Sequence, residues 1–243
     1  MAELLVLAEH RMGELREVTF EMLSKGRNIA EGNGLELTAV LLGHGADGFA
    51  DQLSGYADRV LVMDHPDYAD FNAEAYQQAL SRIISERKPR VTLLGHTSFG
   101  VDLAPALAVE LGTPLATDCI DINIEEGKVL VTRQIYGGKL NVEASLREAD
   151  SHIVTVRPAT FEAEEPRPEK GEIVKLKPPA TVAVEHKRFV EYVEPLPGEI
   201  DIAEADVLVS IGRGIKDEKN LPLIRELAGA LKGEVGCSRP IVD

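Results

Sequence analysis

The sequence has little of what several classes of protein need. It contains no tryptophan and only 5% aromatic residues, so few side chains are available to stack on nucleobases or to form an aromatic cage. Its two cysteines, Cys119 and Cys237, form no spaced pair, which excludes a disulfide framework and a four-cysteine metal site and fits a reducing compartment. A ring-shaped ligand would have to be held mainly by backbone, aliphatic and arginine contacts.

Basic residues and long apolar runs are also scarce. Lys and Arg total 26 against 41 Asp and Glu, a formal charge of -15, so a polyanion would be repelled and nucleic acid is an unfavourable partner. No window approaches the roughly 20 apolar residues of a membrane span, and no basic leader precedes the first apolar run. We therefore expect a cytoplasmic protein that is not inserted in a membrane.

Apolar runs alternate with helical periodicity over the first 111 residues. Each apolar run is about five to eight residues long, and each is followed by a segment whose apolar residues recur every three to four positions. This pattern predicts an α/β fold with a Rossmann-like parallel sheet covered on both faces. The expected strands are 4–8, 35–42, 59–63 and 91–95, and the expected helices are 15–29, 71–87 and 102–111.

After Pro114 the pattern changes to closely spaced strands. Four apolar runs, at 117–124, 129–135, 140–146 and 152–156, follow one another with only turn-like gaps. Two of these gaps contain glycines, which adopt positive φ at little cost, so we expect an antiparallel β extension. The proline-rich stretch 162–181 should be an exposed connecting segment. A further strand is expected over 182–193, and the first domain should comprise residues 1–198.

The second domain, residues 199–243, begins as a nucleotide-binding unit does. A strand at 206–211 leads into Gly212-Arg213-Gly214, and a helix follows at 221–231. The chain stops about 40 residues into a domain that would normally need about 100. We expect this second α/β domain to be incomplete, through a shortened chain, a removed C-terminal region or a split gene product. The residues leave these three explanations open.

Two pairs of residues in this domain are candidates for binding. Gly212 and Gly214 would let the backbone approach a phosphate, and a cation between them, Arg213, suits a phosphate or an electron-rich ring. By itself the pattern is equally compatible with a turn that simply needs glycine. Ser238 and Arg239 should end the next strand, at the same carboxyl edge of the sheet as Arg213. A solvated loop arginine is the alternative interpretation of that pair.

Two segments of this domain resemble a known family. Residues 209–215 (VSIGRGI) and 235–243 (VGCSRPIVD) are similar to the opening of the flavin domain in electron transfer flavoprotein alpha subunits, although Ile211 replaces a glycine often seen there.

The resemblance extends upstream and covers essentially all 243 residues. The segment 104–108 (APALA), with Asp118, and the segment 133–139 (RQIYGGK) are similar to two further family segments, although Gly138-Lys139 departs from the usual Gly-Asn.

The resemblance implies a function and a site. It implies an alpha subunit that forms a heterodimer with an electron transfer flavoprotein beta subunit. That heterodimer would carry electrons through FAD from flavin dehydrogenases to a quinone reductase or another acceptor. The family's FAD contacts map onto Arg213, Ser238 and Arg239, beside the turn glycines Gly212 and Gly214. The later family loops that grip the flavin have no counterpart in the printed sequence. Arg239 is expected to stabilise negative charge on the reduced ring. Such a protein is an electron carrier and needs neither catalytic residues nor a metal.

Two other functions stay open at this point. One is a stand-alone adenine-nucleotide-binding or regulatory domain without flavin. The other is an adenylating or phosphate-transferring enzyme, against which the lack of a glycine-rich Ser/Thr loop argues.

Isolated polar residues after the expected strands receive a simpler interpretation. His10, His44 and His96 are expected to be polar loop residues, and Asp118 and Asp121 to be solvated strand ends rather than a metal pair.

Overall fold

The computed structural model describes residues 2–179, 182, 184, 186–192 and 205–242. The chain divides into two compact units, residues 1–189 and 190–243. The domain boundary expected between residues 198 and 199 falls in the stretch 193–204, which lies outside the described residues.

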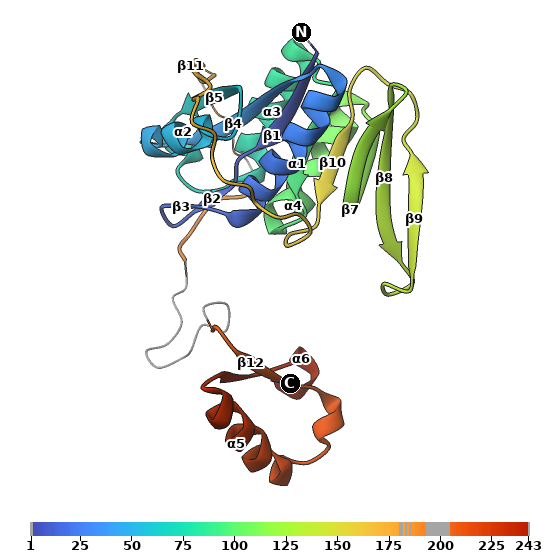
Figure 1. Ribbon diagram of the computed structural model, residues 1–243. Helices are drawn as coiled ribbons and strands as arrows, with labels where there is room; N and C mark the ends of the chain where they lie inside the picture. The colour runs from blue at the N-terminus through green and yellow to red at the C-terminus, as the bar shows by residue number, and fades with distance from the viewer. Residues whose placement is uncertain (1, 180–181, 183, 185, 193–204, 243) are drawn as a thin grey trace. The chain divides into compact units, whose positions relative to one another are not determined.

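A nine-stranded sheet forms the centre of the first unit (Figure 1). Its strands are β1 (Glu3–Leu7), β4 (Glu36–Gly43), β5 (Arg59–Asp64), β6 (Val91–Gly95), β7 (Leu115–Glu125), β8 (Lys128–Ile135), β9 (Leu140–Ser145), β10 (Ile153–Val156) and β11 (Glu172–Lys175). The spatial order is β11-β5-β4-β1-β6-β10-β7-β8-β9. The strands from β11 to β7 pair in parallel, and β8 and β9 continue the sheet antiparallel. The predicted α/β fold and its antiparallel extension are confirmed.

Helices cover both faces of this sheet. They are α1 (Glu17–Asn33), α2 (Asp47–Ser54), α3 (Ala73–Arg87) and α4 (Ser98–Leu111). Successive side chains of a strand point to opposite faces, and in β1 Leu4 joins the apolar cluster that contains Met22 of α1, while Leu5 joins the cluster that contains Leu80 of α3. The central parallel strands β1, β4 and β6 are mostly apolar because both of their faces are buried.

The last strand of the expected meander lies elsewhere. β10 runs parallel between β6 and β7 instead of following β9 at the antiparallel edge. All four of its residues are buried. A strand buried on both faces stabilises the fold most in the centre of a sheet, whereas every residue of β9 is exposed. The meander prediction was therefore wrong for this strand.

Over its described residues 162–179, the connecting segment is exposed or half-buried. It nevertheless contains a strand that the sequence did not suggest, because β11 pairs with β5. A Cβ at Gly171 would overlap the carbonyl oxygen of Ala57 and lie 2.6 Å from that of Asp58, so glycine allows this close approach. The strand expected over 182–193 was wrong for the residues that are described there.

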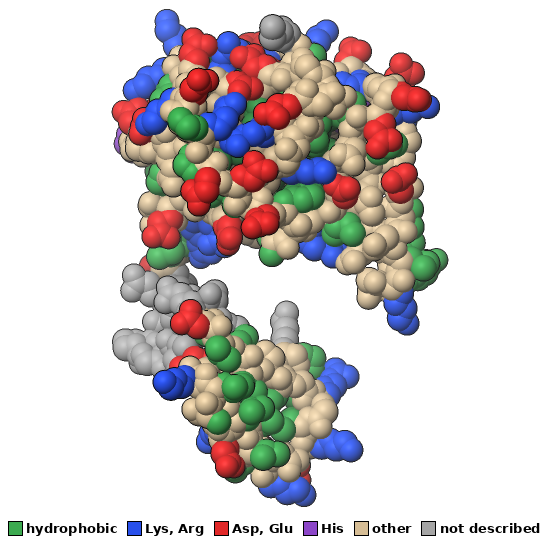
Figure 2. Space-filling model, viewed as in Figure 1, with side chains coloured by type: hydrophobic (Ala, Val, Ile, Leu, Met, Phe, Trp, Pro, Cys, Tyr) green, Lys and Arg blue, Asp and Glu red, His purple; other side chains and the backbone are tan. Residues whose placement is uncertain are grey.

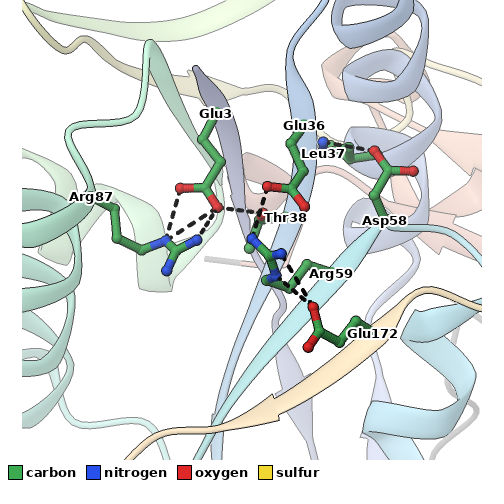
Figure 3. Close-up of polar contacts among 8 residues, drawn as sticks. All are labelled: Glu3, Glu36, Leu37, Thr38, Asp58, Arg59, Arg87 and Glu172. Carbon is green, nitrogen blue, oxygen red and sulfur yellow. Dashed lines mark hydrogen bonds and ion pairs between the residues drawn. The ribbon is translucent and has the colours of Figure 1, made fainter. Parts of the chain in front are cut away.

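Hydrogen bonds and ion pairs of charged side chains connect the amino ends of several strands (Figure 3). The Glu3 carboxylate, whose side chain is 5% exposed, accepts hydrogen bonds from Arg87 at 2.5–3.1 Å and from the Thr38 hydroxyl at 2.8 Å. Arg59 bridges Glu36 at 2.8 Å and Glu172 at 3.2 Å. These contacts join α3, β1, β4, β5 and β11.

The second unit is small and leaves much of its apolar surface open. It contains β12 (Leu208–Ile211), α5 (Leu221–Leu231), β13 (Glu234–Cys237) and α6 (Arg239–Val242), with two short 3-10 turns at Arg213–Ile215 and Glu218–Asn220. β12 and β13 pair in parallel. Figure 2 shows apolar side chains gathered on its surface. Among the described residues of this unit, the exposed large apolar ones are Val190, Val207, Leu208, Leu223, Leu227, Leu231 and Val235.

Candidate functional site

The parallel pairing of β12 and β13 brings two of the predicted site residues together. Ile211 and Cys237 are partners in the register, so Gly212 and Ser238 follow them at the same carboxyl edge. The Ser238 backbone N–H donates to the Ile211 carbonyl oxygen at 3.0 Å. A Cβ built on Gly212 would lie 3.7 Å from the Ser238 Oγ. The hydroxyl group therefore lies directly beside the glycine turn.

The backbone conformation does not require glycine in this turn. Gly212 has φ -132°, and Gly214 does not have a positive φ either. A Cβ on Gly214 would meet no described atom within 4 Å. The two glycines instead keep the space above the turn open, which is the condition that a closely approaching ligand needs.

Arg213 presents a cation at this open edge. It is exposed and begins the 3-10 turn Arg213–Ile215. Within the described part of the chain its guanidinium has no hydrogen bond or ion pair, so its donors are available to a ligand. Arg239 begins α6, which follows β13. The position of its side chain lies outside what the structure describes.

The donors at this edge suit FAD. A guanidinium and a hydroxyl donate to phosphate or ring oxygens, and a turn without side chains lets such groups approach the backbone. The residues present therefore fit the opening of a flavin site.

Two family models match the chain. The electron transfer flavoprotein domain matches residues 4–181, and the electron transfer flavoprotein FAD-binding domain matches residues 201–243. The electron transfer flavoprotein alpha subunit of Clostridium acetobutylicum is 36% identical over 244 residues, which cover 98% of this chain and 73% of that relative. The chain belongs to the electron transfer flavoprotein alpha subunit family. The membership predicted from its motifs is confirmed.

Other members of the electron transfer flavoprotein family show the same extent of similarity. The alpha subunit of Bacillus subtilis is 36% identical over 245 residues, covering 99% of this chain and 73% of the relative. The FixB protein of Clostridium saccharobutylicum is 36% identical over 240 residues, covering 98% of this chain and 72% of the relative. The similarity thus runs through both units.

The three histidines lie in different surroundings. His10 is buried, and its Nε2 lies 2.7 Å from the Leu42 carbonyl oxygen. Its prediction as a polar loop residue was wrong, because His10 begins the short strand β2 (His10–Arg11) and its ring packs beside Phe49. His44 is exposed and lies 3.0 Å from Asp64, and the half-buried His96 lies 2.9 Å from the Thr155 hydroxyl.

The two aspartates lie inside β7 and not at a strand end, and each has a charged partner. Asp118 lies within β7 at a positive φ of 56° and accepts two hydrogen bonds from Arg157, both at 2.8 Å. These bonds hold the pKa of the Asp118 carboxyl below its usual range. Asp121 pairs with Lys25 at 2.8 Å. Arg157 was not singled out in the sequence, since only the fold brings it to Asp118.

The described residues contain neither a group of metal ligands nor a helix that could cross a membrane. Over those residues, no three side chains of the metal-ligating types are grouped so that they could hold an ion. The helices of the same residues include none with the length and apolar character needed to cross a bilayer.

The two cysteines provide a labelling test of the site. Cys237 is exposed beside Ser238, whereas burial raises the pKa of Cys119 to about 12. Because the thiolate is the reactive form, a thiol reagent at pH 8 should label one cysteine in the native chain and two after unfolding. In the complex with the beta subunit, added FAD should slow labelling of Cys237. Unchanged labelling with FAD bound would place the cofactor away from this edge.

Proposed function

We propose that this chain, paired with an electron transfer flavoprotein beta subunit, carries electrons through FAD held at the carboxyl edge of β12 and β13. One observation carries the proposal: Gly212, Arg213 and Ser238 meet at an open edge inside the segment that matches the FAD-binding domain. Bound FAD supplies the redox chemistry. The chain therefore needs only to bind and orient the cofactor.

Each residue has a distinct part in that binding. The guanidinium of Arg213 donates to an acceptor on FAD, and the Ser238 hydroxyl donates from the neighbouring strand. Gly212 and Gly214 leave room for the cofactor above the turn. Arg239, at the start of α6, is proposed to place positive charge near the ring, where it favours negative charge on reduction.

The names of the relatives support the proposed partners. A beta subunit is implied by the alpha subunits that resemble this chain. A 31% identical relative from Anaerotignum propionicum is named as an electron transfer subunit of acryloyl-CoA reductase. We propose that flavin dehydrogenases donate the electrons and that a quinone reductase or another acceptor receives them. The cytoplasmic location stays a prediction.

A substitution of Arg213 tests the site. Arg213→Ala in the complex with the beta subunit should weaken FAD binding about tenfold to a hundredfold, because a hydrogen bond to a charged group contributes about 1.5–3 kcal/mol. The measurement is the FAD dissociation constant by fluorescence or calorimetry. Arg225→Ala is the matched control, since Arg225 is an exposed arginine on α5 of the same unit.

Comparison with the Arg225→Ala control shows which result would contradict the proposed role of Arg213. If Arg213→Ala and Arg225→Ala bind FAD equally well, Arg213 does not contact the cofactor. A complex that purifies without flavin and takes up no added FAD would contradict the function itself. A stand-alone nucleotide domain without flavin is not favoured, because residues 201–243 match a FAD-binding domain.

A further inference from the structure

The antiparallel end of the first unit extends beyond its helices. The strands β8 and β9 and the turn between them, residues 128–145, form an arm that lies outside the helices in Figure 1. β9 is the last strand in the spatial order of the sheet. The hydrogen-bonding groups on its outer side therefore have no strand partner within the described part of the chain. Such an edge is a place where another chain can pair.

The side chains of β9 alternate as they do in a strand with one buried face. Leu140, Val142 and Ala144 point to one side, and polar residues lie between them. All six residues of β9 are nevertheless exposed, Leu140 by 53% and Val142 by 39%. The alternation thus indicates a cover over this face that the described residues do not supply.

The same face is already covered closer to the centre of the sheet. Val142 is the register partner of Arg133, and Ala144 is that of Val131, so each pair points to the same side. Val131 is 2% exposed and belongs to the apolar cluster that contains Met22 of α1. The apolar face of the arm therefore continues the face that α1 covers, and it becomes open from Val131 outward.

Arg133 lies on this face with unused donors. It is half-buried, and its Nε–H is enclosed without an acceptor. Its guanidinium forms no hydrogen bond or ion pair with any residue that the structure describes. Its charge acts on Asp118, but that carboxylate is already held by two hydrogen bonds from Arg157. Because a half-buried cation without an acceptor is unfavourable, a carboxylate brought to this face would be bound.

The turn at the end of the arm presents an aromatic ring. Tyr136 is 75% exposed and has φ 53°, a conformation that is costly for a residue with a Cβ. Gly137 and Gly138 follow with φ 65° and 82° and lead into β9. Backbone strain of this kind persists mainly at functional positions, and tyrosine is enriched among the residues that contribute most to protein interfaces.

The charge of the arm disfavours a second copy of this chain as the cover. Residues 130–142 contain Arg133 and Lys139 and no acidic residue. Two arms packed symmetrically would bring these cations together and would offer Arg133 no carboxylate. A different subunit can supply both an apolar surface and a carboxylate, and the relatives named as alpha subunits imply one such partner.

We propose that the arm formed by β8 and β9 docks the beta subunit. An apolar surface of the beta subunit covers Leu140 and Val142, and a carboxylate at the border of that surface binds Arg133. This inference rests on the proposed pairing with a beta subunit and adds where on this chain the pairing takes place. FAD binding at the carboxyl edge of β12 and β13 is a separate property.

Val142→Asp tests the docking face in the full chain. The variant places a charge within the apolar contact and should weaken association with the beta subunit at least about tenfold. The measurement is the dissociation constant of the two subunits by sedimentation or calorimetry. Val109→Asp is the matched control, because Val109 is 84% exposed on α4, away from the arm. It should leave the dissociation constant unchanged.

Arg133→Gln tests the contact with a carboxylate. Salt screens the attraction between opposite charges, so association of the natural chain with the beta subunit should weaken as sodium chloride is added. Arg133→Gln should weaken association at low salt and reduce its dependence on salt. A purely structural role of Arg133 would change stability without changing that dependence. The same salt dependence in both proteins would overturn the contact.

The remaining outcomes separate the possible occupants of the face. If Val142→Asp binds the beta subunit as the natural chain does, or if Val109→Asp is equally impaired, the arm is not the docking face. A natural chain that dimerises by itself and loses the dimer on Val142→Asp would assign the face to a second copy and overturn the proposal. Should circular dichroism show that Val142→Asp is unfolded, Leu140→Ser takes its place with the same expected result.

Failure of the docking site and failure of the proposed function are distinguishable. A complex that forms through the arm and takes up no FAD would contradict the electron-carrier function and leave the docking site intact. A complex that holds FAD and is unaffected by the substitutions in the arm would overturn only the docking site. A natural chain that does not associate with the beta subunit would overturn both.

Discussion

Gly100→Ala is expected to lower the free energy of unfolding of the first unit by about 3 kcal/mol or more. The new Cβ would overlap the Gly95 carbonyl oxygen. A backbone atom at the end of a central strand cannot move aside as the end of a flexible side chain can. Relief would require α4 to shift away from β6, which would open the packing around Leu103 and Leu107. Urea unfolding measured by far-ultraviolet circular dichroism gives the change.

Gly32→Ala is the matched control for this substitution. Gly32 lies in α1 on the exposed surface, and a Cβ there would meet no described atom within 4 Å. Alanine at an exposed helical position should stabilise the chain by up to about 1 kcal/mol. The two substitutions are chemically identical and should therefore have effects of opposite sign. Equal effects would mean that α4 does not approach β6 this closely.

Arg87→Met is expected to cost about 3 kcal/mol, the second largest of these effects. The Glu3 carboxylate is 5% exposed and receives three of its hydrogen bonds from Arg87 (Figure 3). Without the guanidinium, the Thr38 hydroxyl is the one partner that this nearly buried carboxylate keeps among the described residues. The loss should lie at the lower end of the range for buried pairs because Arg87 is itself 30% exposed.

Two further variants separate the buried charge from lost packing. Arg82→Met removes an exposed arginine from the same helix, which pairs with Glu86 four residues on, and should cost only about 0.5 kcal/mol. Glu3→Gln in the Arg87→Met background removes the unpaired charge and should recover most of the loss. A double variant as unstable as Arg87→Met alone would show that the charge is not the cause.

In the first unit, the sequence predicted where strands and helices lie along the chain better than it predicted which of them lie side by side. The apolar runs and the three- to four-residue spacing predicted β1, β4, β5, β6 and the helices α1 and α3 to within a few residues. Helix α4 begins four residues earlier than expected, at Ser98, because the Thr97 hydroxyl caps it. The short helix α2, with its buried Ala50 and Leu53, was not predicted. Eight residues are too few to show a clear period.

Strand pairing was the weaker part of the prediction. β10 looked like the end of a meander because it follows three closely spaced strands, yet a run of four residues does not show which neighbours it will have. β11 was missed because prolines and charges surround it, and its pairing depends on Gly171 approaching β5. Both strands are placed by contacts between distant parts of the chain.

Some residues of interest could be predicted from sequence motifs, and others could be found only in the fold. The GRG turn and the Ser-Arg pair were found as motifs, and the parallel register of β12 and β13 places Gly212 beside Ser238. No sequence pattern marked Glu9 or Arg157. A glutamate after an apolar run is usually solvated, and only the assembled sheet encloses this one beside Thr97.

The family, the alternation of strands and helices, and the residues that we propose to hold a flavin could all be predicted from the amino-acid sequence. These depend on local periodicity and on short motifs, which are complete within a few neighbouring residues. The pairing of β10 and β11, the need for glycine at positions 100 and 171, and the burial of Glu9 beside Thr97 depend on the tertiary structure. Burial and close backbone approach arise between segments far apart in the chain, so no local pattern contains them.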